Sequence, residues 1–363
     1  MDGRTLYEIV ERYHDFGVHR AGTANDQATA AWYTDELEAR GLTVEALPVA
    51  FDRYVASSTL TADGEAVDHL PLFYEWTGQI ETTDVGVVAA DAHAGGRDGD
   101  LDHALHASAA ATVIATEHPE GSLVAVNREP HDHAGGPTLL IAGADFDRVH
   151  AAKEVRVSVS ATLEPATTTN LVGRNGGSDR APLLLTTPLT GWFGCAGERG
   201  TGAAVLLDLV ERFTDQPLLV LATGGHELDY LGVRTWVPTV AEPIGAIAHI
   251  GASVAVDAPA DDGSRQLIPT RLAMTDQRGA VAAAIERALA PAAFTYRPET
   301  SGWLGESEVF CDLEVPMISF TGSGIDFHTP EDTPERSTSP DALATTAAAI
   351  GDAVEELWRS TGD

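Results

Sequence analysis

Residues 183–237 read LLLTTPLTGWFGCAGERGTGAAVLLDLVERFTDQPLLVLATGGHELDYLGVRTWV, and this stretch decides the fold of the chain. Two short apolar runs, Leu183 to Thr187 and Leu218 to Ala222, are bounded by Pro and Gly and predict strands buried on both faces of a parallel sheet. Between them, Gly202 to Phe213 carries apolar residues at helical spacing. This order predicts a βαβ unit, and such sheets place their sites beyond the carboxyl ends of the strands.

Two polar loops, Pro188 to Arg199 and Gly224 to Asp229, follow these predicted strands. The alternation of strands and helices continues to the end of the chain, and two helices precede it. The further elements are a helix at 5–14, a helix capped at Asn25 or Asp26 and ended by Gly41, a strand at 246–250, a helix at 279–289, a strand at 315–320 and a final helix at 340–358. We therefore expect an α/β fold, a mostly parallel sheet with helices on both faces.

Residues 56–165 differ in texture from the rest of the chain. Short β-like pieces alternate there with loops rich in Gly, Asp and His, and Leu101 to Ala110 has an Ala-rich helical pattern. We expect a β-rich insertion that divides the chain into 1–55, 56–165 and 166–363. The insertion holds eight of the 13 histidines, at 69, 93, 103, 106, 118, 131, 133 and 150. They lack acidic or thiol partners at ligand spacing, which favours scattered surface histidines over a metal site.

Three motifs in the α/β part carry a family resemblance. They are Ala196-Gly197-Glu198-Arg199-Gly200-Thr201-Gly202, His226-Glu227-Leu228-Asp229-Tyr230-Leu231-Gly232 and Phe327-His328-Thr329-Pro330-Glu331-Asp332-Thr333. In order and place they resemble the di-zinc aminopeptidase family, which includes bacterial leucyl aminopeptidases, glutamate carboxypeptidase II and the non-catalytic transferrin receptor. The resemblance covers the N-terminal helices and everything from about Thr168 onward. The insertion resembles the protease-associated domain of several members, which implies a lid or a substrate-selecting wall.

The resemblance implies the family's fold and hydrolysis of a peptide or amide bond at two zinc ions, yet its ligand positions are only partly retained. The first His ligand, the bridging Asp, the general-base Glu, the second-zinc Glu, the Asp ligand and the late His correspond here to Pro188, Gly197, His226, Glu227, His249 and His328. Without a bridging carboxylate, two cations at close range would repel each other. We therefore do not expect a normal two-metal centre.

One zinc ion is the alternative that the retained residues suggest. The predicted ligands are Glu227, His249 and His328, with His226 as a further imidazole and an open position for water. A carboxylate near the metal would take the proton from the bound water. The predicted catalytic residues are His226, Glu198 and Glu306, with Asp332 as another possible base, and the predicted pocket residues are Trp192, Phe193, Arg199 and Trp303.

Each of these residues also has a structural explanation. His226 would cap a helix, His249 would be a satisfied core histidine, and Glu227 would favour a helix N-terminus. The aromatic pair Trp192-Phe193 would fill the volume left by absent metals, and Glu198-Arg199 would form an internal ion pair in place of metal contacts. Two functions therefore stay open: a divergent zinc-dependent hydrolase of peptides or small amides, and a catalytically inactive aminopeptidase-fold protein that acts as a binding or scaffold module.

The charge of the chain restricts which classes of partner it can bind and suggests in which environment it works. The formal net charge is −33, from 55 acidic and 22 basic residues spread along the sequence. An acidic coat of this kind is typical of proteins that stay hydrated in concentrated salt, and it disfavours nucleic acid and anionic membranes as partners. Two cysteines make no disulfide framework, and no stretch reaches the length of a membrane span. We expect a halophilic, cytoplasmic protein, in which an oligomer is possible.

Overall fold

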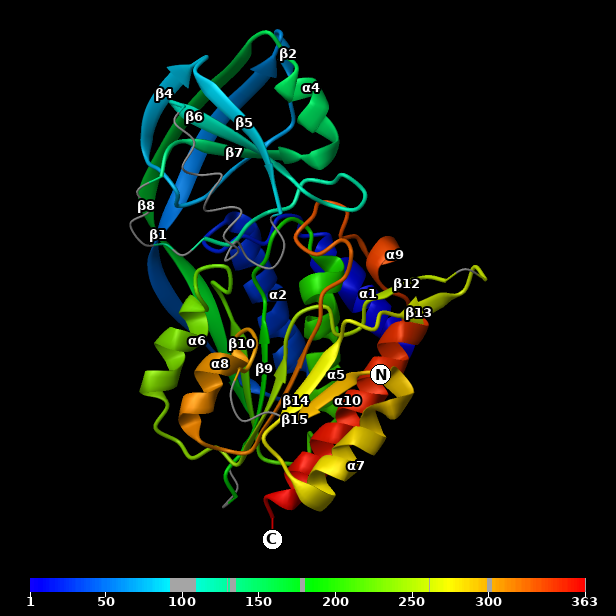
Figure 1. Cartoon of the computed structure of the whole chain (residues 1–363). Helices are drawn as coiled ribbons and strands as arrows, with labels where there is room; N and C mark the ends of the chain where they lie inside the picture. The colour runs from blue at the N-terminus through cyan, green and yellow to red at the C-terminus, as the bar shows by residue number, and fades with distance from the viewer. Residues whose placement is uncertain are drawn as a thin grey trace.

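The computed structural model describes residues 1–91, 109–128, 130, 135–176, 180–260, 262–298 and 302–362. Figure 1 shows a main lobe around most strands of the large sheet and a second lobe above it, which is formed by part of the insertion and contains the remaining strands of that sheet. The sheet has the strand order β15-β14-β16-β11-β9-β10-β8-β1-β2, with β4 beside β8. Its strands are β1 (Thr43–Ala62), β2 (Glu65–Ala66), β4 (Gly78–Thr82), β8 (Val155–Arg174), β9 (Leu183–Pro188), β10 (Leu218–Thr223), β11 (Ala246–Ile250), β14 (Leu272–Thr275), β15 (Thr295–Pro298) and β16 (Met317–Thr321).

The centre of this sheet confirms the predicted α/β fold. Strands β10, β9, β11 and β16 pair in parallel. Their side chains alternate between two cores, because successive residues of a strand point to opposite faces. Leu183 and Leu185 of β9 belong to the core on one face, whereas Leu184 belongs to the core on the other. Burial on both faces explains why these strands are short uninterrupted apolar runs in the sequence.

Helices cover both faces of the sheet. Helices α1, α2, α5, α7 and α10 contribute to the first core, and α6 and α8 contribute to the second. The helices are α1 (Gly3–His14), α2 (Ala24–Ala39), α4 (Phe146–His150), α5 (Thr201–Arg212), α6 (Leu231–Trp236), α7 (Gly279–Leu289), α8 (Ser307–Phe310), α9 (Pro334–Ser337) and α10 (Pro340–Ser360). Short 3₁₀ turns span Gly143–Asp145, Val237–Thr239, Ala290–Ala292 and Cys311–Leu313. The predicted cap of α2 at Asn25 or Asp26 is wrong, because the Thr23 side chain accepts the N–H of Asp26.

The insertion contains a small sheet with the order β3-β7-β6-β5. Its strands are β3 (Leu70–Pro71), β5 (Val85–Ala90), β6 (Ala111–Thr116) and β7 (Thr138–Ala142). Residues 101–108 of the predicted helix at 101–110 lie outside the described residues, and so do residues 92–100 and 131–134 of the loops rich in Gly, Asp and His. The likeness to a protease-associated domain and the division at 56 and 165 stay predictions. Position 56 lies within β1 and position 165 lies within β8. These two strands pair with each other along all 20 residues of each.

Among the described residues, no helix is both long enough and apolar enough to cross a membrane.

Candidate functional site

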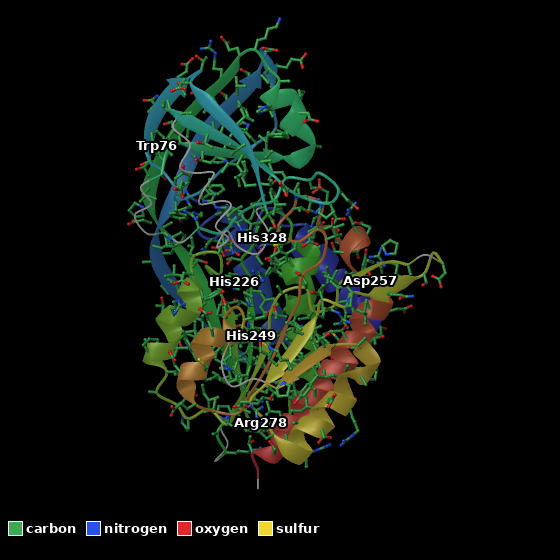
Figure 2. The ribbon with its side chains drawn as sticks, in the orientation of Figure 1. Trp76, His226, His249, Asp257, Arg278 and His328 are labelled. Atoms are coloured by element: carbon green, nitrogen blue, oxygen red, sulfur yellow. The ribbon has the colours of Figure 1, made fainter. Side chains whose placement is uncertain are left out.

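The polar residues singled out in the sequence lie at the carboxyl edge of the main sheet. Strands β9, β10 and β11 end there, at Pro188, Thr223 and Ile250. A π-helical turn at Ala196–Gly200, labelled η2, leads into α5 and carries Glu198 and Arg199. Single π-turns of this kind are frequent at functional sites. In Figure 2, His226, His249 and His328 are spread along the long axis of the molecule rather than gathered at one point.

Glu198, Arg199 and His328 form one buried group, which we call the charged cluster. Arg199 Nη2 lies 2.9 Å from Glu198 Oε1, and both side chains are 1% exposed. His328 Nε2 lies 3.3 Å from the same oxygen. Arg199 Nε donates to the carbonyl oxygen of Thr190 at 2.9 Å, which fixes the guanidinium beside the end of β9. Burial would raise the pKa of Glu198, but Arg199 and His328 outweigh it and lower that pKa to about 2.

His328 also joins this cluster to the insertion. Its Nδ1 lies 3.0 Å from the carbonyl oxygen of Ala125, and the Ala125 N–H donates to the His328 carbonyl oxygen at 2.8 Å. Both ring nitrogens therefore face oxygen acceptors.

Gly197 has no room for the side chain that the family resemblance would place there. A Cβ at this position would lie 2.6 Å from Ser337 Cβ and 2.8 Å from Asp332 Oδ1. Asp332 instead accepts the N–H groups of Gly197 and Glu198, at 2.7 and 3.0 Å, and so holds the π-turn. Burial raises the pKa of Asp332 to about 7, although Ser337 donates a hydrogen bond to it. The carboxylate that faces the late histidine therefore comes from Glu198, one residue further along.

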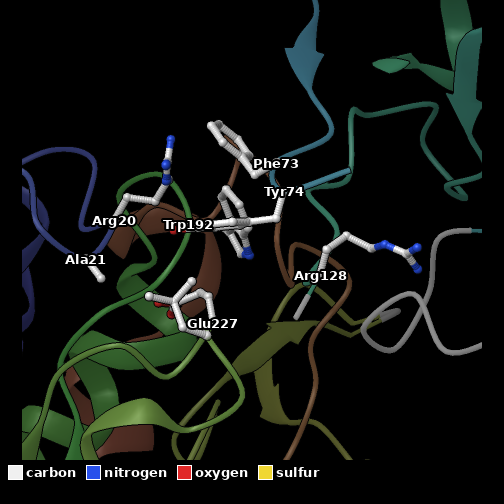
Figure 3. Close-up of a pocket in the computed structure, with 8 residues that line it drawn as sticks. Arg20, Ala21, Phe73, Tyr74, Arg128, Trp192 and Glu227 are labelled. Carbon is white, nitrogen blue, oxygen red and sulfur yellow. The ribbon is translucent and has the colours of Figure 1, made fainter. Parts of the chain in front are cut away.

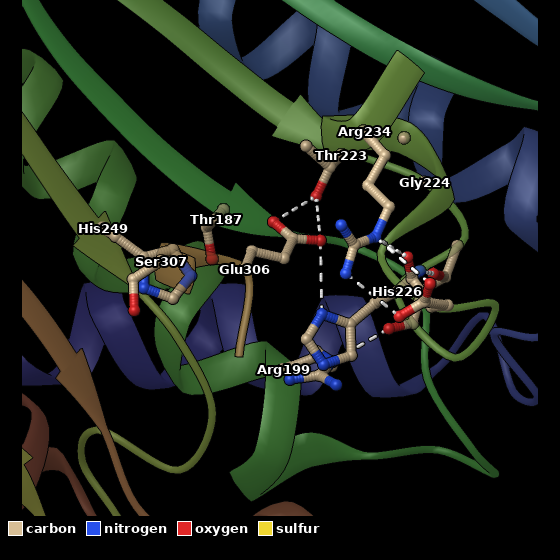
Figure 4. A network of polar contacts seen from close by, with 12 residues as sticks. Thr187, Arg199, Thr223, Gly224, His226, Arg234, His249, Glu306 and Ser307 are labelled. Atoms are coloured by element: carbon tan, nitrogen blue, oxygen red, sulfur yellow. Dashed lines mark hydrogen bonds and ion pairs between the residues drawn. The ribbon is translucent and has the colours of Figure 1, made fainter. Parts of the chain in front are cut away.

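His226 belongs to a second polar group, which Figure 4 shows. Its Nδ1 lies 3.2 Å from Glu306 Oε1, and Thr223 Oγ1 lies 2.8 Å from each Glu306 oxygen. The backbone N–H of His226 donates to Thr190 Oγ1 at 3.1 Å. Burial and then Arg199 lower the pKa of His226 well below its ordinary value, so the ring is neutral at neutral pH. Burial raises the pKa of Glu306.

Glu227 points elsewhere, into a small cavity shown in Figure 3. The cavity has a volume of about 20 Å³, room for one water, and its walls are Arg20, Ala21, Phe73, Tyr74, Arg128, Trp192, Glu227 and Leu228. Neither carboxyl oxygen of Glu227 has a partner of normal hydrogen-bond geometry among the described residues. Burial raises its pKa to about 7, against the opposing effect of Arg199.

His249 is a core histidine, which is the structural explanation considered for it. It is 1% exposed, and its Nδ1 lies 2.9 Å from Ser319 Oγ on the neighbouring strand β16. Its Nε2 has no hydrogen-bond partner in the described part of the chain. Burial lowers the pKa of His249 to about 4, so it is uncharged at neutral pH.

The predicted pocket residues also lie in different parts of the molecule rather than around one pocket. Trp192 lies in the wall of the small cavity and packs against Phe73 of the insertion, with 5.2 Å between the ring centroids and the rings tilted by 36°. Its Nε1–H donates to Asn127 Oδ1 at 2.6 Å. Trp192 belongs to a hydrophobic core made mostly of insertion residues, and Phe193 packs against that core. Trp303 is 9% exposed and belongs to the second core of the main lobe. The aromatic loop therefore helps to join the two lobes.

A larger hollow lies beside the charged cluster. Its volume is about 280 Å³, and Glu198, Asp332, Ser253 and Ser337 are among its lining residues. The hairpin of β12 (Asp257–Pro259) and β13 (Arg265–Leu267), residues 324–327 and Glu120 of the insertion supply most of the other walls. Figure 1 shows this hairpin next to α9. No pattern in the sequence predicts this hollow, because its walls come from segments that are far apart in the chain.

The described residues do not fit the zinc ion that the family resemblance implies. No group of three or more His, Cys, Asp or Glu side chains among them is disposed to hold a metal. Glu227, His249 and His328 have separate surroundings, and both nitrogens of His328 face other partners. The buried guanidinium of Arg199 lies beside Glu198, and a metal at this carboxylate would meet strong like-charge repulsion.

Comparison with solved structures shows the fold. A zinc aminopeptidase from Bacillus subtilis is 16% identical, with a TM-score of 0.74 over 98% of this chain and 95% of that chain. A peptidase M28 precursor from Shewanella amazonensis is 17% identical, with a TM-score of 0.70 over 99% and 96%. An aminopeptidase from an Aneurinibacillus strain is 16% identical, with a TM-score of 0.64 over 97% and 93%. No family model matches the sequence, and no curated protein sequence matches it. The chain has the fold of these aminopeptidases.

Proposed function

We propose that this aminopeptidase-fold chain is a catalytically inactive binding module, which holds a peptide or a small amide without a metal ion. The observation that carries the proposal is the buried ion pair between Arg199 and Glu198, at 2.9 Å. A guanidinium supplies the positive charge at the sheet edge where a metal-dependent hydrolase needs a cation that activates water. An arginine is always protonated and cannot act as a Lewis acid in this way.

His328 supports the same proposal. In the predicted one-zinc site it would donate a lone pair to the metal. Here its two ring nitrogens lie next to Ala125 O and Glu198 Oε1. The imidazole thus joins the insertion to the charged cluster, and a cavity for a small ligand remains beside that cluster.

The second candidate is the one-zinc hydrolase of peptide or amide bonds. One observation favours it: Glu227 and His249, two of the predicted ligands, keep buried polar atoms without partners among the described residues. A metal that drew these two residues together would satisfy both. The two candidates differ in metal content and in turnover, so one experiment separates them.

The experiment is a zinc measurement combined with an assay. The chain is purified in molar salt without chelator, its zinc content is measured by plasma mass spectrometry, and hydrolysis of aminoacyl-nitroanilides is followed with and without added zinc. We expect substoichiometric zinc and no hydrolysis, with identical results for the wild type and a His328→Ala variant. Stoichiometric zinc and hydrolysis that are both lost in His328→Ala would establish the hydrolase instead.

A further inference from the structure

The large hollow has room for a small ligand with an apolar body. Its volume of about 280 Å³ is close to the lower end of the range for small-molecule pockets, roughly 300–1,000 Å³. Ile325 lies in its wall and is 45% exposed, which is unusual for a large apolar side chain in the described part of the chain. The other apolar residues of the lining are Val256, Ala258, Pro259, Ile268 and Phe327. An apolar group that covers this surface gains about 25 cal/mol for each Å² removed from water.

Acidic side chains outnumber basic ones in the lining. The described residues contribute five carboxyl groups and two guanidiniums, from Glu120, Glu198, Asp257, Asp326, Asp332, Arg265 and Arg336. Asp257 Oδ1 lies 2.7 Å from Arg265 Nε, so this acid has a cation of its own. Glu198 has one in Arg199, which adjoins the hollow at 2.9 Å. Asp332 accepts hydrogen bonds from two backbone N–H groups and one hydroxyl. The two acids that remain, Glu120 and Asp326, are balanced less completely.

Glu120 and Asp326 share the single guanidinium of Arg336. Arg336 Nε lies 2.7 Å from Asp326 Oδ1, and Nη2 of the same side chain pairs with Glu120 Oε2. The second oxygen of each acid, Asp326 Oδ2 and Glu120 Oε1, accepts no hydrogen bond from the described residues. Asp326 is only 6% exposed, and buried polar atoms normally have a partner. This pair of acids therefore has one negative charge in excess and two open acceptor atoms.

The backbone holds Glu120 in this place. His118 Nδ1 accepts the N–H of Glu120 at 3.2 Å, and His118 Nε2 lies 2.7 Å from the carbonyl oxygen of Ile325. Because a backbone N–H can only donate, Nδ1 carries no proton, and Nε2–H donates to Ile325. The insertion is thus tied to the segment that contains Asp326. A ligand that contacts both acids would find them already positioned, which lowers the cost of binding.

We propose that the hollow binds a primary amine, with its ammonium group between Glu120 and Asp326. The apolar body of the ligand then packs against Ile325 and Phe327. The proposal rests on the proposed function, because it assumes a ligand that is held without a metal. An ammonium group has three N–H donors, so it can serve both open oxygens at once. It belongs with these two acids rather than with Glu198, whose charge Arg199 already balances.

Three ligands with the same phenyl body and different polar ends test the proposal. They are 2-phenylethylamine, 2-phenylethanol and 3-phenylpropionate, which carry an ammonium group, a hydroxyl and a carboxylate. Their binding to the full chain is measured by ligand-observed NMR at the lowest salt concentration that keeps the chain folded, because salt screens charges. We expect the amine to bind at least about threefold more tightly than the alcohol, and the carboxylate to bind most weakly. Equal or tighter binding of the alcohol or the carboxylate would overturn the proposal.

Phenylalaninamide separates two sources of the amine. It has the same phenyl body and an ammonium group next to an amide, as the amino-terminal residue of a peptide has. Binding as tight as that of 2-phenylethylamine would assign the site to amino-terminal residues, and weaker binding would assign it to simple amines. Both outcomes support an ammonium site, provided that 2-phenylethylamine binds more tightly than the alcohol.

A Glu120→Gln variant tests the position of the ammonium group. It removes the excess charge and leaves Arg336 to Asp326, so the preference for the amine over the alcohol should disappear while the alcohol binds as before. Glu154→Gln is the matched control, because Glu154 is also an exposed acid of the insertion and pairs with Arg156. A preference that survives in Glu120→Gln, or that is lost equally in Glu154→Gln, would contradict the proposal.

A Gly324→Val variant tests the position of the apolar body. A Cβ at Gly324 would lie 3.0 Å from Val256 Cγ1 and 3.9 Å from Ile268 Cδ1, and all three residues line the hollow. The added side chain should fill part of the hollow and weaken the amine and the alcohol alike, by about tenfold. Thermal denaturation checks that the variant is folded. Unchanged binding of both ligands to the folded variant would place the ligand elsewhere and overturn the proposal.

Failure of the proposed function has a different signature. Zinc content and the ammonia released from phenylalaninamide are measured in every mixture. Cleavage of the amide together with bound zinc would overturn the proposed function, and the amine site would still be judged on 2-phenylethylamine, which has no amide bond. Equal binding of amine and alcohol without zinc or cleavage would overturn the amine site alone.

Discussion

Glu198 and Glu227 are two glutamates at one sheet edge, 1% and 5% exposed, and they ionise in opposite ways. The pKa of Glu198 is lowered to about 2, and that of Glu227 is raised to about 7. Burial acts in the same direction on both. The difference is the effect of Arg199, which lies 2.9 Å from Glu198 through its Nη2 and outweighs burial there, whereas burial outweighs Arg199 at Glu227. Partners, rather than depth, decide which carboxyl group is charged here.

The largest effect should come from removing the cation. Arg199→Met leaves Glu198 as an uncompensated buried charge, so we expect a loss of about 3–5 kcal/mol in the free energy of unfolding at neutral pH. Urea denaturation in molar salt measures it. The double variant Glu198→Gln/Arg199→Met removes both charges and should recover most of the loss. A loss below about 1 kcal/mol in the single variant would mean that Arg199 does not hold the Glu198 charge.

Glu227→Gln should show an effect of the opposite sign. A carboxyl group whose folded pKa is raised from 4.5 to about 7 keeps its proton in the folded state after the unfolded chain has lost it. The wild type therefore loses unfolding free energy as pH rises from about 4.5 to 7, and the Gln variant lacks this loss. Relative to their difference at pH 4.5, the variant should gain about 3 kcal/mol over the wild type above pH 7.

The quantity to analyse is the difference in unfolding free energy between the wild type and Glu227→Gln at each pH, because other groups titrate in both proteins. Asp332 has a pKa raised to about 7 by burial and contributes to both curves in the same window. If zinc were held by Glu227, the variant would be less stable than the wild type when zinc is added. That result would break the comparison and support the hydrolase.

The smallest effect concerns a third buried glutamate. Glu306 has the Thr223 hydroxyl and the neutral ring of His226 as partners, and burial raises its pKa. Thr223→Val keeps the shape of the side chain and removes the donor, so we expect a loss of about 1 kcal/mol in unfolding free energy and a further rise in the pKa of Glu306. Thr235→Val on the exposed part of α6 is the control. Equal losses in the two variants would show that Glu306 gains nothing from the hydroxyl.

Several strands and helices of the main lobe were predictable because their patterns are local, among them β9, β10, β11, α5, α7 and α10. Strands β14 and β15 were not predicted. The strand at 246–250 and the helix at 279–289 have the predicted bounds. The N-cap of α2 was missed, because Thr23, Asn25 and Asp26 all have side chains that can cap a helix, and the backbone conformation selects Thr23. In the insertion short β-like pieces were expected, and the structure has short strands there, β6 and β7 among them.

The candidate site was predictable in its residues and not in its pairings. The sequence identified Glu198, Arg199, His226, Glu227, Glu306 and His328, which all lie around the sheet edge. It could not show that His226 turns to Glu306, 80 positions away, or that His328 turns to Ala125, 203 positions away. Which partner each histidine contacts depends on its side-chain rotamer and on the path of the loops around it. Thr223 was missed because it is the last residue of a strand, and nothing local distinguishes its hydroxyl.

The paired strands β1 and β8 have a mechanical consequence. Each has 20 residues, so each spans up to about 65 Å of extended chain from the main sheet into the insertion. One end of this ribbon lies beside β10, whose last residue is Thr223. Hydrogen-bonded backbone therefore connects the upper lobe directly to the strand that ends at Thr223, three residues before His226. Removing the upper lobe would cut both β1 and β8 in the middle of their paired stretch, so neither lobe can be expressed separately without breaking this ribbon.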